Sequence, residues 1–207
     1  MSLKLGDTAP DFTAKTQFGD IAFHDWAGDN WVYFFSHPAD FTPVCTTEMG
    51  RTAQLAKEFA KRGVKPLGLS VDSPEEHVEW IKDVNETQHT QLEFPILADE
   101  DRKVSELYGM IHPGESETAS VRSVFIIDPN KKIRLMMTYP MSVGRNFDEI
   151  LRVIDSLQTA DKYGIATGAD WKPGDAVIVP PSVSTEDARK KFDNVEVVKP
   201  YLRYTNL

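Results

Sequence analysis

Hydrophobic and polar positions along the chain follow two alternating periods, which predicts a mixed α/β protein. The run NWVYFFS (Asn30–Ser36) is aromatic and β-branched and too short for a helix, so it predicts a buried strand. From Thr42 the apolar residues recur at helical spacing, and KRG (Lys61–Gly63) supplies the basic last turn and the glycine of a helix end. Val64–Asp72 predicts the next strand.

The remaining segments up to residue 158 continue this alternation. SPEE places Ser73 at an N-cap, Pro74 at the first helical position and Glu76 in a capping box. The pattern then predicts a short strand at Phe94–Asp99 and a short helix at Arg102–Met110. It also predicts a hairpin of Val121–Asp128 with Ile133–Tyr139, followed by a longer helix at Asn146–Gln158. A βαβ half with a parallel crossover, joined to a ββα half, is the thioredoxin-like arrangement.

The pattern changes after Gln158. Residues 159–207 are rich in glycine and proline, with one short strand, one short helix and a β-prone end. A segment of about fifty residues is too small to bury a core alone, yet it carries Trp171, Phe192 and Tyr201. We therefore expect a thioredoxin-like α/β domain over residues 1–158. Residues 159–207 would form a small α+β extension that packs against that domain or a second subunit.

Composition and charge narrow the function classes. The 207 residues carry a formal net charge of −9, which argues against nucleic acid or an anionic membrane as partner. No apolar run has the length of a signal peptide core or a membrane span. One cysteine cannot form an intrachain disulfide, so we expect a cytoplasmic protein in a reducing compartment. His24, His77, His89 and His112 lack metal-ligand spacing, so neither a metal nor another cofactor is expected.

Cys45, the single cysteine, lies in an unusual sequence setting. A free cysteine is usually a small buried apolar residue. Here TPVC places Thr42 at an N-cap and Cys45 in the first helical turn, where free N–H groups and the helix dipole favour a thiolate. Thr42 and Cys45 face the same side. A thiolate beside a hydroxyl fits a peroxide substrate, because fixed donors can stabilise charge on the departing oxygen, and Pro38 and Phe41 can exclude water.

The same residues resemble a known motif. HPADFTPVCTTE is similar to the peroxiredoxin pattern P-x-x-x-T-x-x-C, met by Pro38, Thr42 and Cys45. YPMSVGRNFDEILRVIDSLQ and WKPGDAVIVPP…YLRYT resemble the matching segment and the C-terminal extension of one-cysteine (peroxiredoxin VI type) members of the alkyl hydroperoxide reductase/thiol-specific antioxidant family. The resemblance covers nearly the whole chain. It implies a thioredoxin-like fold and a thiol-dependent peroxidase that reduces hydrogen peroxide and alkyl hydroperoxides.

The resemblance also implies roles for individual residues. Those at the reacting centre are the nucleophile Cys45, the hydrogen-bond donor Thr42, the cation Arg122 and the shielding residue Pro38. The supporting residues are Arg145, Glu48 and His37. A carboxylate at Glu48, one turn after Cys45, would oppose the thiolate, and the resemblance suggests that the arginines neutralise it. His37 either lines the pocket or makes hydrogen bonds within its loop.

Peroxide attack would leave a sulfenic acid on Cys45. Since the chain has no second cysteine, an external thiol or another reductant must recycle it. The alternative hypothesis is a peroxide sensor or redox-switched holdase that uses Cys45 without efficient turnover. A cysteine hydrolase with His37 or His24 as base would not explain the motif, and the absence of C-x-x-C excludes a thioredoxin-type oxidoreductase. The resemblance further implies a homodimer or a higher oligomer, with residues 159–207 at the dimer interface.

A second activity of the family is not expected here. Some animal members carry a phospholipase activity attributed to a serine in GDSWG, a histidine and an aspartate. This chain has GDNWV, with Asn30 in place of the serine, His24 at the histidine position and Asn130 at the aspartate position. Without a hydroxyl nucleophile, covalent acyl chemistry of that type is lost.

Overall fold

The computed structural model describes residues 2–207, which divide into two compact units. The first unit ends at Phe147 and the second comprises Asp148–Leu207. Helix α6 (Phe147–Tyr163) begins at this division and also contains Gln158, after which the sequence pattern changes.

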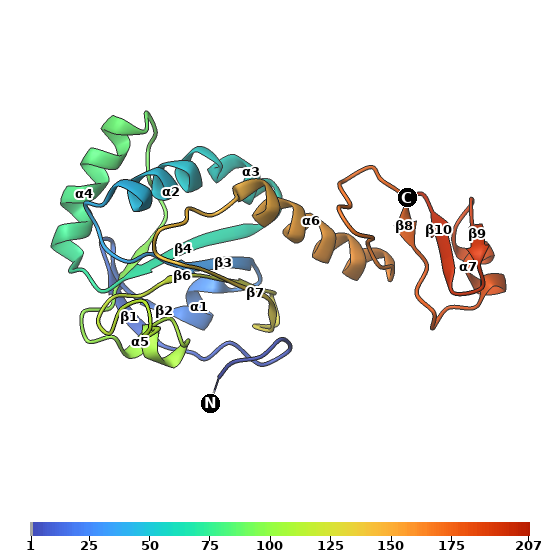
Figure 1. Ribbon diagram of the computed structural model, residues 1–207, viewed down its shortest axis with the longest axis horizontal. Coiled ribbons are helices and arrows are strands. Elements are labelled where there is room, and N and C mark those ends of the chain that lie inside the picture. Colours follow the sequence, from blue (N-terminus) through green and yellow to red (C-terminus); the bar gives the residue numbers. More distant parts are fainter. Residues whose placement is uncertain (1) are drawn as a thin grey trace. The chain divides into compact units, whose positions relative to one another are not determined.

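A seven-stranded sheet in the order β2-β1-β5-β4-β3-β6-β7 forms the centre of the first unit (Figure 1). Its strands are β1 (Thr13–Thr16), β2 (Gly19–Ala22), β3 (Trp31–Ser36), β4 (Val64–Ser70), β5 (Ile96–Ala98), β6 (Arg122–Ile127) and β7 (Ile133–Tyr139). Strands β3, β4 and β5 are parallel, while β6 pairs antiparallel with both β3 and β7. The predicted thioredoxin-like arrangement, with a hairpin added to a parallel βαβ half, is confirmed.

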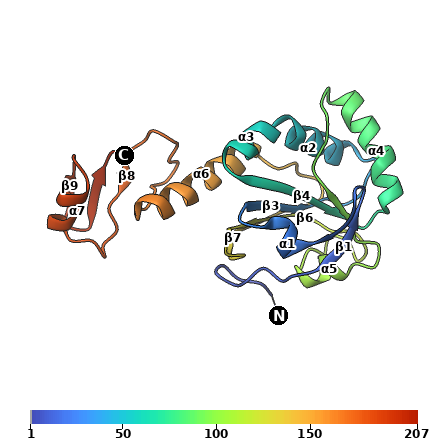
Figure 2. The same ribbon diagram turned by 180° about the vertical axis from the view of Figure 1, so that it is seen from behind.

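Helices cover both faces of this sheet. Figures 1 and 2 show α2, α3 and α4 on one face and α1 and α5 on the other. Their bounds are α1 (Phe23–Ala27), α2 (Pro43–Gln54), α3 (Ala56–Lys61), α4 (Pro74–Thr87) and α5 (Lys103–Leu107). Side chains alternate along β3, so Val32 and Phe34 enter the core beside α1 and α5, while Tyr33 stacks on Phe59 of α3. Burial on both faces explains why β3 is apolar from Trp31 to Phe35.

The structure differs from the sequence pattern at two places. The helix expected from Thr42 to Gly63 is two helices, because Leu55 leaves helical geometry with a ψ of 7° between α2 and α3. The N-terminal hairpin β1–β2 and helix α1 were not predicted, since four-residue strands such as TAKT carry little periodic signal. The capping box of Ser73 and Glu76 at α4 is confirmed, with both reciprocal hydrogen bonds present.

The second unit contains a sheet in the order β8-β10-β9 and a short helix. These elements are β8 (Val177–Ile178), α7 (Thr185–Lys191), β9 (Glu196–Lys199) and β10 (Leu202–Thr205). Trp171, Val177 and Phe192 belong to a small buried core, so this segment packs more of its own apolar surface than its size suggested. Val198 and Tyr201 stay exposed. Among residues 2–207, no helix is long and apolar enough to cross a membrane.

Candidate active site

Cys45 is the third residue of α2, at the end of a loop that follows β3. Thr42 is the N-cap residue with extended backbone and Pro43 opens the helix, as the sequence predicts. The Thr42 side chain does not cap the helix, however, because its Oγ1 donates a hydrogen bond to the carbonyl of Ala39 at 2.9 Å. The first-turn N–H groups of α2 are therefore not capped by Thr42, and the side chain of Cys45 in the same turn is fully buried.

Arg122, the first residue of β6, holds its guanidinium against the sulfur. Its Nη1 donates to Sγ of Cys45 at 3.3 Å and to Oε2 of Glu48 at 2.7 Å. Its Nε and Nη2 both donate to the carbonyl of Met141, at 3.0 and 2.7 Å. The arginine is 3% exposed, so these contacts rather than water fix its position.

Glu48 and Arg145 form a buried ion pair behind the cysteine. Oε1 of Glu48 accepts from the backbone N–H and Nε of Arg145 at 2.8 and 2.9 Å, and Oε2 accepts from its Nη2 at 2.6 Å. Arg145 also donates through Nη1 to the carbonyl of Ser36. Burial by itself raises the pKa of Glu48, but the charge and hydrogen bonds of Arg145 outweigh it and hold that pKa below its ordinary value.

The charges of the buried groups at this site do not cancel. Two guanidiniums and one carboxylate, all nearly fully buried, leave one net positive charge beside Sγ of Cys45. The structure thus brings Cys45, Arg122, Arg145 and Glu48 together, and it relieves the repulsion that Glu48 alone would exert.

Pro38 and His37 lie in the loop before α2, and both are buried. The His37 backbone donates to the carbonyl of Leu69, and its ring lies 5.1 Å from that of Trp80. The ring Nε2 is 2.8 Å from Oδ1 of Asp40. The His37 ring thus makes a hydrogen bond within its own loop.

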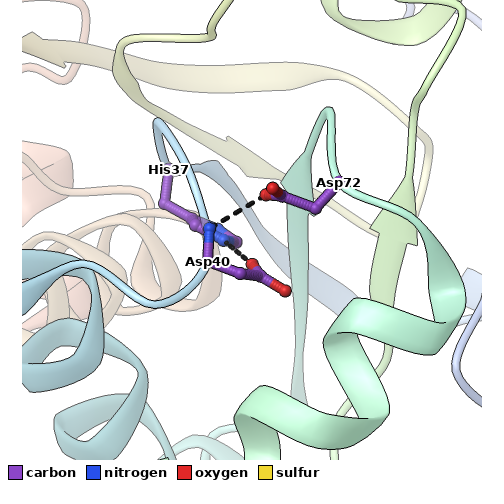
Figure 3. A group of neighbouring side chains, drawn as sticks. All are labelled: His37, Asp40 and Asp72. Atoms are coloured by element: carbon purple, nitrogen blue, oxygen red, sulfur yellow. Dashed lines mark hydrogen bonds and ion pairs between the residues drawn. The ribbon is translucent and has the colours of Figure 1, made fainter.

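Asp40 is the centre of a network that we call the Asp40 network: His37, Asp40, Asp72 and His77. Figure 3 shows His37, Asp40 and Asp72 of this network. Nδ1 of His77 is 2.6 Å from Asp40 Oδ2 and its Nε2 is 3.2 Å from the carbonyl of Leu97, so both ring nitrogens face acceptors and the ring is cationic. Burial opposes this charge, but the hydrogen bond and charge of Asp40 raise the pKa of His77. Burial also lowers the pKa of His37, which remains neutral.

Three side chains of this network lie as close together as the ligands of a metal ion would. One ring nitrogen of His37 and one carboxylate oxygen each of Asp40 and Asp72 lie within 4.8 Å of one another. Metal binding through Nε2 would put a proton on Nδ1 of His37, which is buried and has no hydrogen-bond partner among residues 2–207. Asp40 and Asp72 oxygens already accept hydrogen bonds. The network therefore fits a structural support for the loop, where Phe41 adopts a left-handed φ of 54°.

Sequence reasoning missed several groups at this site. Met141 contributes only a backbone carbonyl, which leaves no side-chain signal in a sequence. Asp40 and His77 are far apart along the chain, and the only local sign was an aspartate three residues after His37. Arg122 was found through the family resemblance alone. Arg145 was found through the resemblance and through its position before a helix N-terminus, where a cation is locally unfavourable.

Comparison with known proteins shows the family of this chain. Residues 5–136 match the AhpC/TSA family, and residues 156–194 match the C-terminal domain of 1-Cys peroxiredoxin. The 1-Cys peroxiredoxin of Dictyostelium discoideum is 52% identical over 204 residues, covering 98% of this chain and 85% of that protein. Peroxiredoxin-6 of Homo sapiens is 49% identical over 217 residues, covering 98% of this chain and 97% of that protein.

A solved structure of yeast mitochondrial 1-Cys peroxiredoxin, described for thiol resolution via glutathione/thioredoxin systems, has a TM-score of 0.95. It is 50% identical and covers 99% of this chain and 100% of that one. This protein has a thioredoxin-like fold with a buried cysteine beside two arginines. Its class is that of thiol peroxidases that are recycled by an external reductant. The chain belongs to the AhpC/TSA family, as a 1-Cys peroxiredoxin.

Proposed function

We propose that Cys45 is the nucleophile that attacks the peroxide, and that Arg122, Thr42 and Pro38 complete the reacting centre. The observation that supports this most directly is the 3.3 Å contact between Nη1 of Arg122 and the buried Sγ. The contacts of Arg122 with Cys45, Glu48 and Met141 use four of its five N–H groups. The fifth, on Nη2, can donate to a peroxide oxygen.

Thr42 and Pro38 would orient and enclose the substrate. The Thr42 proton is directed to the Ala39 carbonyl, so in this conformation Oγ1 presents lone pairs to the site. We propose that it accepts the O–H of the hydroperoxide, a role complementary to the donor role that the resemblance implied. Pro38 is buried in the same loop and excludes water from the sulfur.

The reaction follows from these positions. The Cys45 thiolate attacks the terminal oxygen of the hydroperoxide, an S–O bond forms and the O–O bond breaks. The departing alkoxide, stabilised by the Arg122 guanidinium, takes up a proton to become an alcohol, or water from hydrogen peroxide. Cys45 is left as a sulfenic acid. One external thiol then forms a mixed disulfide and releases water, and a second thiol displaces the Cys45 thiolate.

The Cys45→Ser variant tests this proposal. We expect it to lose peroxide consumption, while Thr47→Ser, at an exposed position on the same helix, retains it. Intact-protein mass spectrometry should show one added oxygen in the parent after one equivalent of peroxide, removed again by excess thiol. Peroxide consumption by Cys45→Ser near the parent rate would refute the role of Cys45. Oxidation of the parent without repeated turnover would favour the sensor or holdase alternative.

We also propose a homodimer with residues 159–207 at its interface. In the described part of the chain, β7 is an edge strand that pairs with no strand other than β6, although its first residue, Ile133, bonds to the backbone of Gly6 and Asp7. The second unit exposes Val198 and Tyr201. Sedimentation equilibrium of the full chain and of a Val198→Asp/Tyr201→Asp variant tests this. Weaker association of the variant supports the proposal, an unchanged assembly contradicts this interface, and the parent mass distinguishes a dimer from a higher oligomer.

The cytoplasm remains our proposal for the compartment, supported by the acidic composition and the single cysteine. The similar yeast protein is mitochondrial, so cell fractionation with markers of both compartments is the deciding measurement. We propose no phospholipase activity, because Asn30 offers no hydroxyl and its Nδ2 donates to the carbonyl of Ala27. Release of fatty acid from phospholipid vesicles by the purified chain would contradict this.

A further inference from the structure

The geometry of Arg122 depends on one backbone carbonyl. Both Nε and Nη2 donate to the oxygen of Met141, which fixes the plane of the guanidinium and directs Nη1 at the sulfur and at Glu48. A shift of this carbonyl would move the guanidinium away from Cys45. The position of Met141 therefore affects the reacting centre, although its own side chain is not part of it.

Met141 belongs to a loop that has little core to hold it. It follows β7, and Ser142, Val143 and Gly144 after it are all exposed. At the far end the loop is fixed where the Arg145 backbone donates to Glu48. At the near end, the N–H of Met141 donates to Oε2 of Glu115 at 3.1 Å. The residue whose carbonyl holds Arg122 is thus itself held by a carboxylate.

Glu115 comes from a separate part of the chain, the exposed loop between α5 and β6. Its own backbone N–H donates to the carbonyl of His112 at 2.8 Å, which closes a turn and limits where the side chain can reach. This carboxylate makes no contact with Cys45, Arg122 or Glu48 in the described structure. Any effect on the chemistry must pass through Met141.

We propose that Glu115 is a positioning residue for peroxide reduction, acting through the Met141 backbone on the guanidinium of Arg122. The inference rests on the proposed role of Cys45. Loss of one exposed hydrogen bond corresponds to roughly a 3- to 10-fold effect. We expect Glu115→Ala to lower the second-order rate constant for oxidation of Cys45 by about that factor, with little effect on unfolding.

The dependence of Cys45 alkylation on pH distinguishes a positioning effect of Glu115 from a direct effect of its charge, because the two effects shift it in opposite directions. Removing a negative charge near a thiolate favours the thiolate, so a pure charge effect moves alkylation of Cys45 by iodoacetamide to lower pH. Displacement of Arg122 moves it to higher pH. Glu115→Gln removes the charge but keeps an oxygen that can accept from Met141, so it should stay close to the parent in both measurements.

The experiment compares Glu115→Ala, Glu115→Gln and the control Glu117→Ala by stopped-flow oxidation, alkylation against pH and urea unfolding. Glu117 is exposed in the same loop and accepts from Arg102 only through its backbone carbonyl, which the substitution keeps. Slower oxidation and a shift to higher pH in Glu115→Ala alone support the proposal. Equal rates for Glu115→Ala and Glu117→Ala, a shift to lower pH, or equal loss in Glu115→Gln would overturn it. Cys45→Ser in the same assay tests the underlying role of the cysteine separately.

Discussion

Replacement of Glu48 by glutamine removes one charge from the buried ion pair at almost constant shape. Each oxygen of Glu48 accepts two hydrogen bonds, so the amide NH₂ of glutamine leaves two N–H donors without an acceptor in either orientation. A hydrogen bond to a charged group contributes about 1.5–3 kcal/mol, so the loss comes to roughly 3–6 kcal/mol. Removal of one partner of a buried ion pair costs about 3–5 kcal/mol, which agrees with this sum over hydrogen bonds. We expect Glu48→Gln to lose about 3–5 kcal/mol of unfolding free energy at neutral pH.

Urea unfolding at several pH values measures this loss. Because the pKa of Glu48 is lowered on folding, its carboxylate contributes stability above the unfolded pKa of about 4.5, and that stability disappears as pH falls through the folded pKa. The difference between parent and Glu48→Gln should therefore shrink on acidification. Glu79→Gln, which removes the exposed pair with Lys82, is the control and should unfold like the parent. A loss below about 1 kcal/mol at neutral pH would refute the charge balance described for this site.

Three further predictions address the arginine, the helix contact and the Asp40 network. Arg122→Ala should move the alkylation of Cys45 to higher pH, whereas Arg51→Ala, at an exposed position, should leave it unchanged. An unaltered dependence of alkylation on pH in Arg122→Ala would contradict the proposed role of Arg122 beside the sulfur. Gly50→Ala should lower the free energy of unfolding, measured with urea, by about 1–3 kcal/mol, because the added Cβ would lie 2.3 Å from Cγ of Gln88. In the control Gly114→Ala the added Cβ has no atom within 4 Å, and equal stabilities of the two variants would contradict the prediction. The pKa of His77 is raised, so its stabilisation is full below about pH 6.5 and is lost as pH rises through the folded value. The stability deficit of His77→Gln should therefore narrow towards alkaline pH, and a deficit that widens contradicts the cationic assignment.

Local patterns predicted the elements whose signals are continuous in sequence. Strand β3 is apolar from Trp31 to Phe35 because it is buried on both faces, and α4 carries its capping box, so both were predictable. The interruption at Leu55 was not, because the apolar spacing on either side of it still fits one helix. Short edge elements such as β1 and β2 depend on pairing partners that a local pattern does not contain.

The site was predictable where a side chain lies within the motif and only by family resemblance elsewhere. Thr42 and Cys45 follow from helix-start chemistry, whereas nothing local to Arg122 distinguishes it from a surface arginine that opens a strand. Contacts made by backbone atoms, such as the carbonyl of Met141, cannot be predicted from residue type. They emerge only when distant segments meet in the folded chain.

The chain has a single sulfhydryl, and its side chain is wholly enclosed in the folded state. A bulky maleimide dye can therefore label the protein at only one position, and only during moments when the first turn of α2 swings open or unravels. At saturating dye the rate of labelling then equals the rate of that opening. A bulky reductant must reach the same enclosed sulfur, so recycling of Cys45 also requires this part of the chain to open.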